Sequence, residues 1–311
     1  MENISTLQNR LNKGLFVITT EVSSPDSSDN KTLNKRLSFL SKYSDAINAT
    51  DASGAHCHMS SVAVCALMVQ QKIEPILQIS CRDRNRIAIQ GDILGANALG
   101  IKNILCLTGD GVQTGDHPEA KPVFDLDSIS LLETASTLKN KGTFLSGRKL
   151  EKSPNIFLGA AANPFVPPFE FRVFRLQKKI AAGCQFIQTQ YCFDIQRFKT
   201  FMHQAYNLGL TEKCSILVGV GPLRSGRVAE WMSKNVPGVV IPEKIIQNLK
   251  KTPKEQQKTE GKKICIELIN EIQDIQGVSG IHIMAYLLEE LVPEIIEESA
   301  LPNESKNRNN Q

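Results

Sequence analysis

Short runs of apolar and β-branched residues recur along the chain, and most of them are followed by a stretch with helical spacing. Eight of these runs are predicted strands. Most are nearly continuous in apolar residues, which is typical of parallel strands that are buried on both faces. The predicted strands cover residues 15–21, 46–50, 75–81, 103–110, 155–163, 185–190, 215–221 and 280–285.

Amphipathic segments fill most of the intervals between the predicted strands. The first carries Leu33, Leu37 and Leu40 at helical spacing, so that one face is apolar. Strand–helix alternation of this kind indicates βα units joined by right-handed crossovers. The predicted helices cover residues 31–43, 85–99, 128–138, 169–182, 195–208, 260–275 and 286–298, with an extra helix near 242–249.

Eight βα units in a chain of 311 residues predict a single-domain (β/α)8 TIM barrel over residues 1–300, with a polar tail at 301–311. A doubly wound open sheet is the alternative. Such a sheet usually carries a GxGxxG turn after its first strand, and the segment EVSS at 21–24 has none. Two segments stand outside the alternation. Residues 139–153 are expected to be a solvated excursion, and residues 250–263 a charged linker.

Composition narrows the class of protein. A chain that is 41% hydrophobic and 22% charged is typical of a soluble globular domain, and a dispersed net charge of +4 does not indicate nucleic-acid binding. No apolar run reaches the roughly 20 residues of a membrane helix, and the first 14 residues hold no apolar signal core, so we expect a cytoplasmic protein that binds no membrane. The eight cysteines form no CxxC pair and are expected to stay reduced. The triplet His56-Cys57-His58 alone is a poor metal site, because consecutive residues rarely converge on one ion.

Polar residues gather where the predicted strands end, which is where (β/α)8 barrels carry their chemistry. In a closed barrel these ends meet at one rim, so Glu21 and Asp110 are predicted to face the same mouth. Carboxylates and amides around one mouth suit a polar heterocycle, with one acid kept for proton transfer. The strand-end residues are Glu21, Thr50, Asp51, Cys81, Arg82, Asp110, Asn163 and Gln190, and His282 lies inside the last strand.

Each of these residues also has a structural interpretation. Glu21 could cap a turn, although a carboxylate at the end of an apolar strand is costly unless it has a function. Asp110 could belong to an ordinary Gly-Asp-Gly turn, Gln190 could satisfy nearby backbone groups, and His282 could be a core histidine. Two interpretations stay open for the arginines of CRDRNR, a solvated helix start or a grip on an anion; they are Arg82, Arg84 and Arg86.

Three longer strings carry a resemblance to a known family. They are CLTGD ending at Asp110, KKIAAGCQFIQTQYCFD from Lys178 to Asp194, and GVSGIHIM close to the last predicted helix. With these strings the chain resembles the methylenetetrahydrofolate reductase family from about Gly14 to Glu298. The resemblance implies a flavin-dependent (β/α)8 barrel. In that family NAD(P)H gives a hydride to FAD, and the flavin passes it to 5,10-methylenetetrahydrofolate to form 5-methyltetrahydrofolate.

The resemblance also implies roles for individual residues. Glu21 corresponds to the proton donor that opens the five-membered folate ring to an iminium. Asp110 corresponds to the aspartate that contacts the pterin and tunes the flavin, and Gln190 to the glutamine that touches folate and nicotinamide in alternation. Thr50 falls near the nicotinamide site, and the implied flavin-side positions are Gln78, Thr108, Gly109, Asp110, Asn163 and Lys179.

The chain departs from the family pattern mainly on the flavin side. Thr108 replaces a frequent arginine, Gln78 a common histidine, and Leu288 stands near the place of a folate-facing arginine. Arg172 and Arg175 stand where the family tends to have other polar residues, and the TTEVSSP opening has lost the aromatic residues of the family.

The departures leave alternatives to a flavoenzyme open. One is a flavin-free enzyme that passes hydride directly from NAD(P)H to folate. Another is a flavin-free folate-binding subunit that hands one-carbon units to a methyltransferase or corrinoid partner, which would not need the proton donor Glu21. An aldolase-like barrel is disfavoured, because no lysine lies on a predicted strand to form a Schiff base. The expected ligand is a small folate; a homo-oligomer and a partner subunit are both left open.

Overall fold

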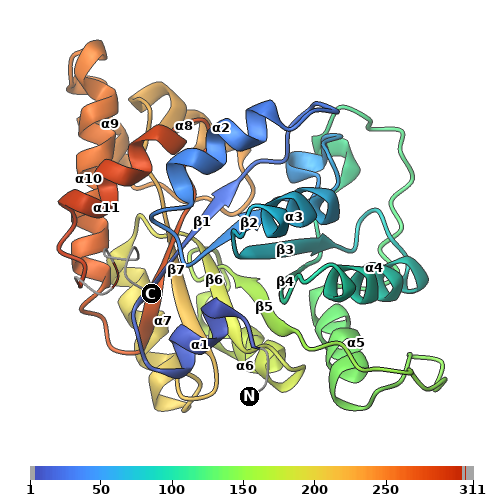
Figure 1. The fold of residues 1–311 in the computed structure, drawn as a ribbon. Helices are drawn as coiled ribbons and strands as arrows, with labels where there is room; N and C mark the ends of the chain where they lie inside the picture. Colours follow the sequence, from blue (N-terminus) through green and yellow to red (C-terminus); the bar gives the residue numbers. More distant parts are fainter. Residues whose placement is uncertain (1–3, 303–304, 306–311) are drawn as a thin grey trace.

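Eight parallel strands close into a barrel in the computed structural model, which describes residues 4–302 and 305 (Figure 1). Each strand pairs with the next one in sequence, and the first pairs with the last through registers such as Thr19 opposite His282. The predicted (β/α)8 barrel is therefore confirmed, and the open-sheet alternative is wrong. The strands are β1 (Val17–Val22), β2 (Ala46–Ala49), β3 (Pro75–Ser80), β4 (Asn103–Leu107), β5 (Phe157–Ala162), β6 (Phe186–Tyr191), β7 (Ser215–Val220) and β8 (Val278–Ile283).

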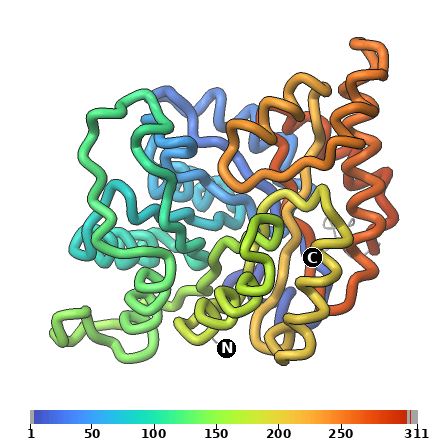
Figure 2. Tube along the Cα trace, turned by 180° about the vertical axis from the view of Figure 1, so that it is seen from behind, coloured from blue at the N-terminus to red at the C-terminus, as the bar shows by residue number. Residues whose placement is uncertain are grey.

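Helices surround the strands (Figures 1 and 2). Apolar side chains of the helices pack against those on the outer faces of the strands. Within the described residues, none of the helices is both long and apolar enough to cross a membrane. Short 3-10 turns occur at Ser53–Ala55, Val112–Thr114, Phe169–Phe171, Lys254–Gln256 and Glu289–Leu291. The α-helices are α1 (Thr6–Asn12), α2 (Lys31–Leu40), α3 (Ser61–Gln70), α4 (Arg86–Ala98), α5 (Ser128–Asn140), α6 (Arg172–Ala181), α7 (Ile195–Asn207), α8 (Gly226–Asn235), α9 (Glu243–Lys251), α10 (Gln257–Ile272) and α11 (Val292–Glu298).

The segment 250–263 is mostly helical, so the prediction of a charged linker is wrong. Helix α9 continues to Lys251, and α10 begins at Gln257. Lysine, glutamate and glutamine are good helix formers. The prediction gave more weight to the charge of the segment than to this helix propensity. The residues around Pro253 separate the two helices, because a proline cannot extend the helix that precedes it.

Three helices were not predicted from the apolar pattern, namely α1, α3 and α8. Helix α3, with the sequence SVAVCALMVQ, is apolar nearly all round and shows no amphipathic period. Helix α11 starts at Val292, later than expected, because the chain first turns at Leu287, where φ is 54°. The predicted excursion at 139–153 is largely exposed and is closed by an isolated bridge between Thr143 and Lys149.

The barrel interior is apolar at the end where the strands begin. A separate buried cluster fills this end, and Phe157 stacks on Phe186 with ring centroids 5.0 Å apart. Helix α1 closes it with Leu7, which is fully buried. Asn103 at the start of β4 is a buried polar exception that donates to Glu74 and to the Pro75 carbonyl oxygen. The polar side chains that line the pocket lie at the opposite end, the mouth formed by the carboxyl ends of the strands. The cluster consists of Leu7, Val17, Ala46, Ile76, Leu105, Phe157, Phe186 and Leu217.

Candidate active site

A pocket of about 450 Å³ opens at the carboxyl ends of the strands, within the range of small-molecule sites. Glu21 from β1, Asp110 from the loop after β4 and Gln190 from β6 all line it. The two carboxylates thus share one mouth, as the strand order predicted. The pocket is also lined by Gln78, Thr108, Gly109, Asn163 and Lys179, which were predicted as cofactor contacts.

Glu21 lies between two polar side chains of the barrel interior. Its Oε2 accepts a hydrogen bond of 3.0 Å from Nε2 of Gln78. On the other side, Nε2 of His282 lies 3.9 Å from the same oxygen. The Glu21 side chain is 25% exposed, so its carboxyl group can meet both the pocket and these two neighbours.

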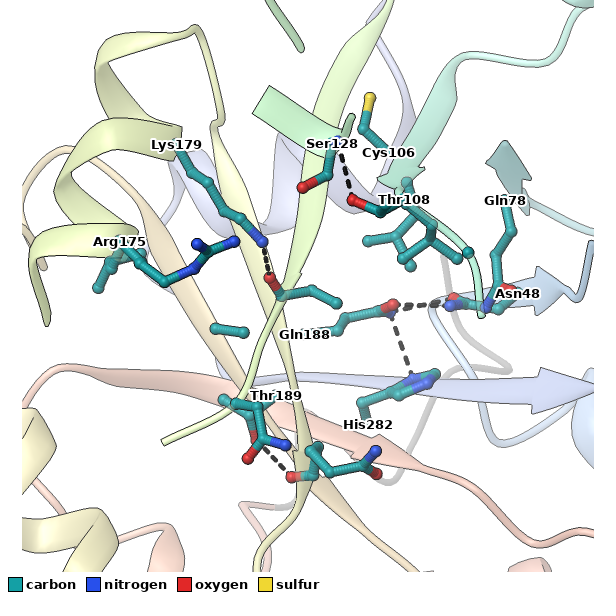
Figure 3. A pocket seen from close by; sticks show the side chains of 18 of the residues that line it. Asn48, Gln78, Cys106, Thr108, Ser128, Arg175, Lys179, Gln188, Thr189 and His282 are labelled. Atoms are coloured by element: carbon teal, nitrogen blue, oxygen red, sulfur yellow. Dashed lines mark hydrogen bonds between the residues drawn. The ribbon is translucent and has the colours of Figure 1, made fainter. Parts of the chain in front are cut away.

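A buried polar layer lies below Glu21 and joins β1, β2, β6 and β8 (Figure 3). Asn48 and Gln188 exchange two hydrogen bonds through their carboxamides, at 2.6 Å and 3.0 Å. Nε2 of Gln188 also lies 3.2 Å from Thr19 Oγ1 and 3.3 Å from Nδ1 of His282. Thr19 Oγ1 and His282 Nδ1 are 3.0 Å apart, which closes the layer.

The opposite wall of the pocket is cationic. Arg172, Arg175 and Lys179 on α6 line it, and Figure 3 shows Arg175 and Lys179 reaching toward the pocket from the side opposite Asn48. Lys179 is 8% exposed, donates to the carbonyl oxygen of Ala161 at 2.5 Å, and has no ion pair with a carboxylate among the residues described. Burial lowers the pKa of Lys179, since the charged form is poorly solvated there. This wall therefore suits an anionic group of a ligand.

The turn after β4 brings Asp110 to the mouth. Gly109 adopts a φ of 91°, and a Cβ there would lie 2.2 Å from Ser80 Oγ on β3. Glycine is thus favoured at this position by the neighbouring strand end. The side chain of Asp110 is exposed, whereas the Thr108 hydroxyl accepts a hydrogen bond of 3.0 Å from the backbone N–H of Ser128 at the start of α5.

Two amides at the mouth are engaged with the loop after α8. Gln190 Nε2 donates to the carbonyl oxygen of Pro237 at 3.4 Å, and Asn163 Nδ2 donates to that of Gly238 at 2.9 Å. Their oxygens also accept from the backbone, Gln190 Oε1 from the Tyr191 N–H and Asn163 Oδ1 from the Phe165 N–H, each at 3.0 Å. Both side chains line the pocket, and a ligand would meet the second N–H and the second lone pair of each amide.

Other strand-end residues lie outside the pocket wall and have structural partners. The Thr50 hydroxyl accepts a 3.0 Å hydrogen bond from the Ser24 backbone N–H, so the structure does not bring it to the pocket.

The arginines of the CRDRNR segment form ion pairs with carboxylates of the protein itself. The ion pairs are Arg82 with Asp83 at 2.7 Å, Arg84 with Asp51 at 2.6 Å and Arg86 with Asp125 at 2.8 Å. Hydrogen bonds from Arg86 lower the pKa of Asp125 to about 2. The structural interpretation of this segment is therefore supported over an anion grip.

Asn48 and Gln188 are site residues that the sequence analysis missed. Asn48 is the polar residue of the short apolar strand AINA, and Gln188 lies two positions before Gln190 in FIQTQY, on the same face. That spacing was the available signal. The described residues contain no group of three or more side chains able to hold a metal ion, and all eight cysteines are free.

A model of the methylenetetrahydrofolate reductase family matches residues 6–300. The chain belongs to the methylenetetrahydrofolate reductase family. The sequence resemblance is thereby confirmed. Two similar curated proteins are a probable methylenetetrahydrofolate reductase (NADPH) of Caenorhabditis elegans, 22% identical over 250 residues, and methylenetetrahydrofolate reductase 2 of Schizosaccharomyces pombe, 28% identical over 255 residues. The alignments cover 78% and 76% of this chain but only 35% and 37% of those proteins, so the chain spans little more than a third of their length.

Among solved structures, a protein from Clostridium thermocellum described as binding two copies of 5-methyl-5,6,7,8-tetrahydrofolic acid has a similar fold. The TM-score is 0.67 at 15% identity, and the match covers 94% of this chain and 98% of that one. At this identity the similarity shows a shared fold.

Proposed function

We propose that this member of the methylenetetrahydrofolate reductase family reduces 5,10-methylenetetrahydrofolate to 5-methyltetrahydrofolate, with NAD(P)H as the hydride source and a bound flavin, FAD, as the carrier. The observation that carries the proposal is the position of Glu21. Glu21 lines the pocket together with Asp110 and Gln190, residues of β1, of the loop after β4 and of β6 that the proposed folate reduction needs at one place. A protein that only binds folate does not need a proton donor beside its ligand.

The chemistry of the substrate explains the acid. The methylene carbon of the closed folate ring is a poor hydride acceptor, because both of its nitrogen neighbours are neutral. A proton from Glu21 to one of these nitrogens breaks its bond to the methylene carbon and leaves an iminium, which accepts hydride readily. Gln78 stabilises the carboxylate that remains, through its 3.0 Å hydrogen bond to Oε2. Asp110 and Gln190 offer an acceptor and an amide to the polar edge of the pterin.

The cationic wall fits a dinucleotide. Arg172, Arg175 and Lys179 would hold the phosphates of the flavin, because a buried ammonium without a carboxylate partner is stabilised by an anionic oxygen. When bound, the flavin supplies reversible two-electron hydride transfer between the nicotinamide and the folate. The residues of the chain contribute binding, orientation and the proton.

A second candidate is a flavin-free folate-binding subunit that passes one-carbon units to a methyltransferase or corrinoid partner. One observation favours it. Thr108 and Asn163, two of the expected flavin-side residues, already bond to the backbone at Ser128 and Gly238. The fold similarity to a protein described as binding 5-methyltetrahydrofolic acid is compatible with this candidate as well as with the enzyme.

The colour and turnover of the purified protein separate the candidates. Yellow protein that releases flavin on denaturation and oxidises NAD(P)H with 5,10-methylenetetrahydrofolate supports the proposal. Colourless protein with the same turnover supports a direct hydride transfer without flavin. Colourless protein that binds folate and turns over neither substrate supports the binding subunit.

Replacing the acid tests its assigned role. Glu21→Gln should lower the rate of folate reduction by about 10²- to 10⁴-fold, because the amide cannot give up a proton. Oxidation of NAD(P)H by an artificial acceptor should continue, since that step needs no proton from Glu21. Stopped-flow measurement of both half-reactions checks this. Glu212→Gln is the matched control, because that exposed glutamate precedes β7 at the other end of the barrel. Full folate turnover in Glu21→Gln would remove Glu21 from the mechanism.

The cationic wall makes a separate prediction about cofactor affinity. Lys179→Met should weaken FAD binding by about ten- to a hundredfold, as expected for one charge-assisted hydrogen bond. Binding of riboflavin, which has no phosphate, should change little. Lys178→Met is the control, because Lys178 is exposed on the same helix and does not line the pocket. Equal losses for FAD and riboflavin would show that Lys179 does not meet a phosphate.

A further inference from the structure

We propose that His282 is a positioning residue for Glu21, held by a buried polar layer in the tautomer that carries its proton on Nε2. The catalytic role of His282 rests on the proposed function, whereas its tautomer is inferred from the geometry alone. His282 is 2% exposed, and its two ring nitrogens face different partners: Nδ1 faces the layer, and Nε2 faces Glu21.

The layer presents hydrogen-bond donors to Nδ1. One hydrogen on Gln188 Nε2 goes to Asn48 Oδ1 at 3.0 Å. The second lies between Thr19 Oγ1 at 3.2 Å and His282 Nδ1 at 3.3 Å. When it goes to Thr19, the threonine hydroxyl can donate to Nδ1, which is 3.0 Å away, or to the Ile281 carbonyl oxygen, which is 3.3 Å away. If it donates to Ile281, Nδ1–H would donate to Thr19 Oγ1, and a bare Nε2 would face the Glu21 carboxylate oxygen at 3.9 Å. The shorter contact to Nδ1 and the acceptor on the other side of the ring together favour the arrangement in which Nδ1 accepts and the single proton of the neutral imidazole sits on Nε2.

The reverse arrangement places two lone pairs against each other. If both carboxamides were turned over, the Gln188 oxygen would face Nδ1–H, and a bare Nε2 would face the Glu21 carboxylate across 3.9 Å. Gln78 donates to that same carboxylate oxygen, which shows an acceptor there. An N–H on His282 is therefore the complementary partner for Glu21 in its ionised form.

This assignment explains why polar residues are buried so deeply in the barrel. Thr19, Asn48, Gln188 and His282 are each at most 3% exposed, and a buried polar layer is costly unless its members satisfy one another. In the reaction, the proton leaves Glu21 for the folate nitrogen, and the new carboxylate keeps the hydrogen bond from Gln78 and faces the Nε2–H of His282 at 3.9 Å. No charge moves onto the imidazole. The layer keeps the histidine neutral and aimed at Glu21.

Nitrogen NMR of protein labelled with ¹⁵N-histidine tests the tautomer directly. The chain has five histidines, and the other four, His56, His58, His117 and His203, are not buried. The signals of His282 are identified as those lost in His282→Asn. We expect the two-bond correlation pattern of an Nε2–H tautomer in the wild-type protein.

Variants of the layer connect the tautomer to its cause. Thr19→Val removes a hydroxyl while keeping the side-chain shape and leaves Gln188 to donate to Nδ1, so it should shift the Nδ1 resonance but keep the Nε2–H form. Thr19→Val combined with Gln188→Met removes both donors and should introduce the Nδ1–H form. Thr19→Ser combined with Gln188→Met, which keeps a hydroxyl, should retain the Nε2–H form. Thr134→Val is the matched control, because Thr134 is equally buried on α5 but donates to the Ser130 carbonyl away from the pocket. A Thr19→Val, Gln188→Met double variant that keeps the Nε2–H pattern of the wild type overturns the proposal, as does an Nδ1–H or doubly protonated ring in the wild-type protein.

A kinetic measurement links the tautomer to Glu21. Thr19→Val combined with Gln188→Met should lower kcat for folate reduction by about tenfold, whereas Thr19→Val alone and Thr134→Val should each change it less than twofold. An unchanged kcat in the double variant would show that the tautomer does not serve Glu21. If the wild-type protein shows the Nε2–H tautomer but no folate turnover, the proposed function fails while the assignment of the layer stands.

Discussion

Single residues at the strand ends shape the mouth of the barrel. Gly109 is the clearest case. Its φ of 91° is unfavourable for a residue with a side chain, and an added Cβ would lie only 2.2 Å from Ser80 Oγ. Its place in the chain fixes where Asp110 enters the mouth. The loop conformation at the site is thus set by packing against β3 before any ligand binds.

Replacing Gly109 tests this account. Gly109→Ala should reduce the free energy of unfolding by roughly 2–5 kcal/mol, since it adds a clash to the strain of a positive φ. Gly147→Ala is the matched control, because Gly147 has a φ of 84° and nothing within 4 Å of an added Cβ. It should lose only the strain, about 1–2 kcal/mol. Urea unfolding of the two variants measures the difference, and equal losses would contradict the role of Ser80.

Some residues of the site could be predicted from the sequence, and others could not. Glu21, Asp110 and Gln190 were predictable because each ends an apolar strand, and a closed barrel gathers such ends at one rim. Thr50 has the same position in its strand, yet its hydroxyl is used by Ser24. Which strand-end group faces the pocket depends on the partners it finds, and these lie far away in the sequence.

At the scale of the elements, close packing overrides local preference. Helix α10 carries Gly261 at a point where the helix meets the segment after β7, and an added Cβ would lie 1.7 Å from the Leu223 carbonyl oxygen. The glycine lowers the helix propensity of α10 but allows the approach. The long helix can therefore cover the barrel between β7 and β8.

Two glycine-to-alanine changes in helices should have opposite signs. Gly261→Ala should destabilise the protein by roughly 1–3 kcal/mol, because the backbone has to move apart. Gly95→Ala in α4 should stabilise it by about 0.5–1 kcal/mol, since nothing lies within 4 Å of an added Cβ there. Thermal or urea unfolding of both variants measures the signs. A stabilising Gly261→Ala would contradict the packing of α10.

At the scale of the whole molecule, the two ends of the barrel differ in polarity. The end where the strands begin is filled by apolar side chains and closed by Leu7 of α1, while the other end holds the polar layer and the pocket. Stability and chemistry are therefore placed at opposite ends, which allows each to change without the other.

Truncating the plug tests that separation. Leu7→Ala should lower the free energy of unfolding by roughly 2–5 kcal/mol, because Leu7 is fully buried and its loss leaves a cavity. Affinity of the folded variant for 5-methyltetrahydrofolate should stay within twofold of the wild type. Fluorescence titration at a temperature well below the unfolding midpoint checks the affinity. A large loss of affinity would show that the two ends are coupled.

The sequence by itself determined the strand–helix alternation, the closed barrel and the family, because apolar periodicity and the long strings around Asp110 and Gln190 are local properties. Only the tertiary structure decided that Arg84 is paired with Asp51, that Lys179 is buried with no carboxylate ion pair among the described residues, and that Thr19, Asn48, Gln188 and His282 form one layer. The physical reason is that hydrogen bonds and ion pairs join residues by distance in space. Asn48 and Gln188 are 140 positions apart in the chain, yet their side chains are hydrogen-bonded to each other in the barrel.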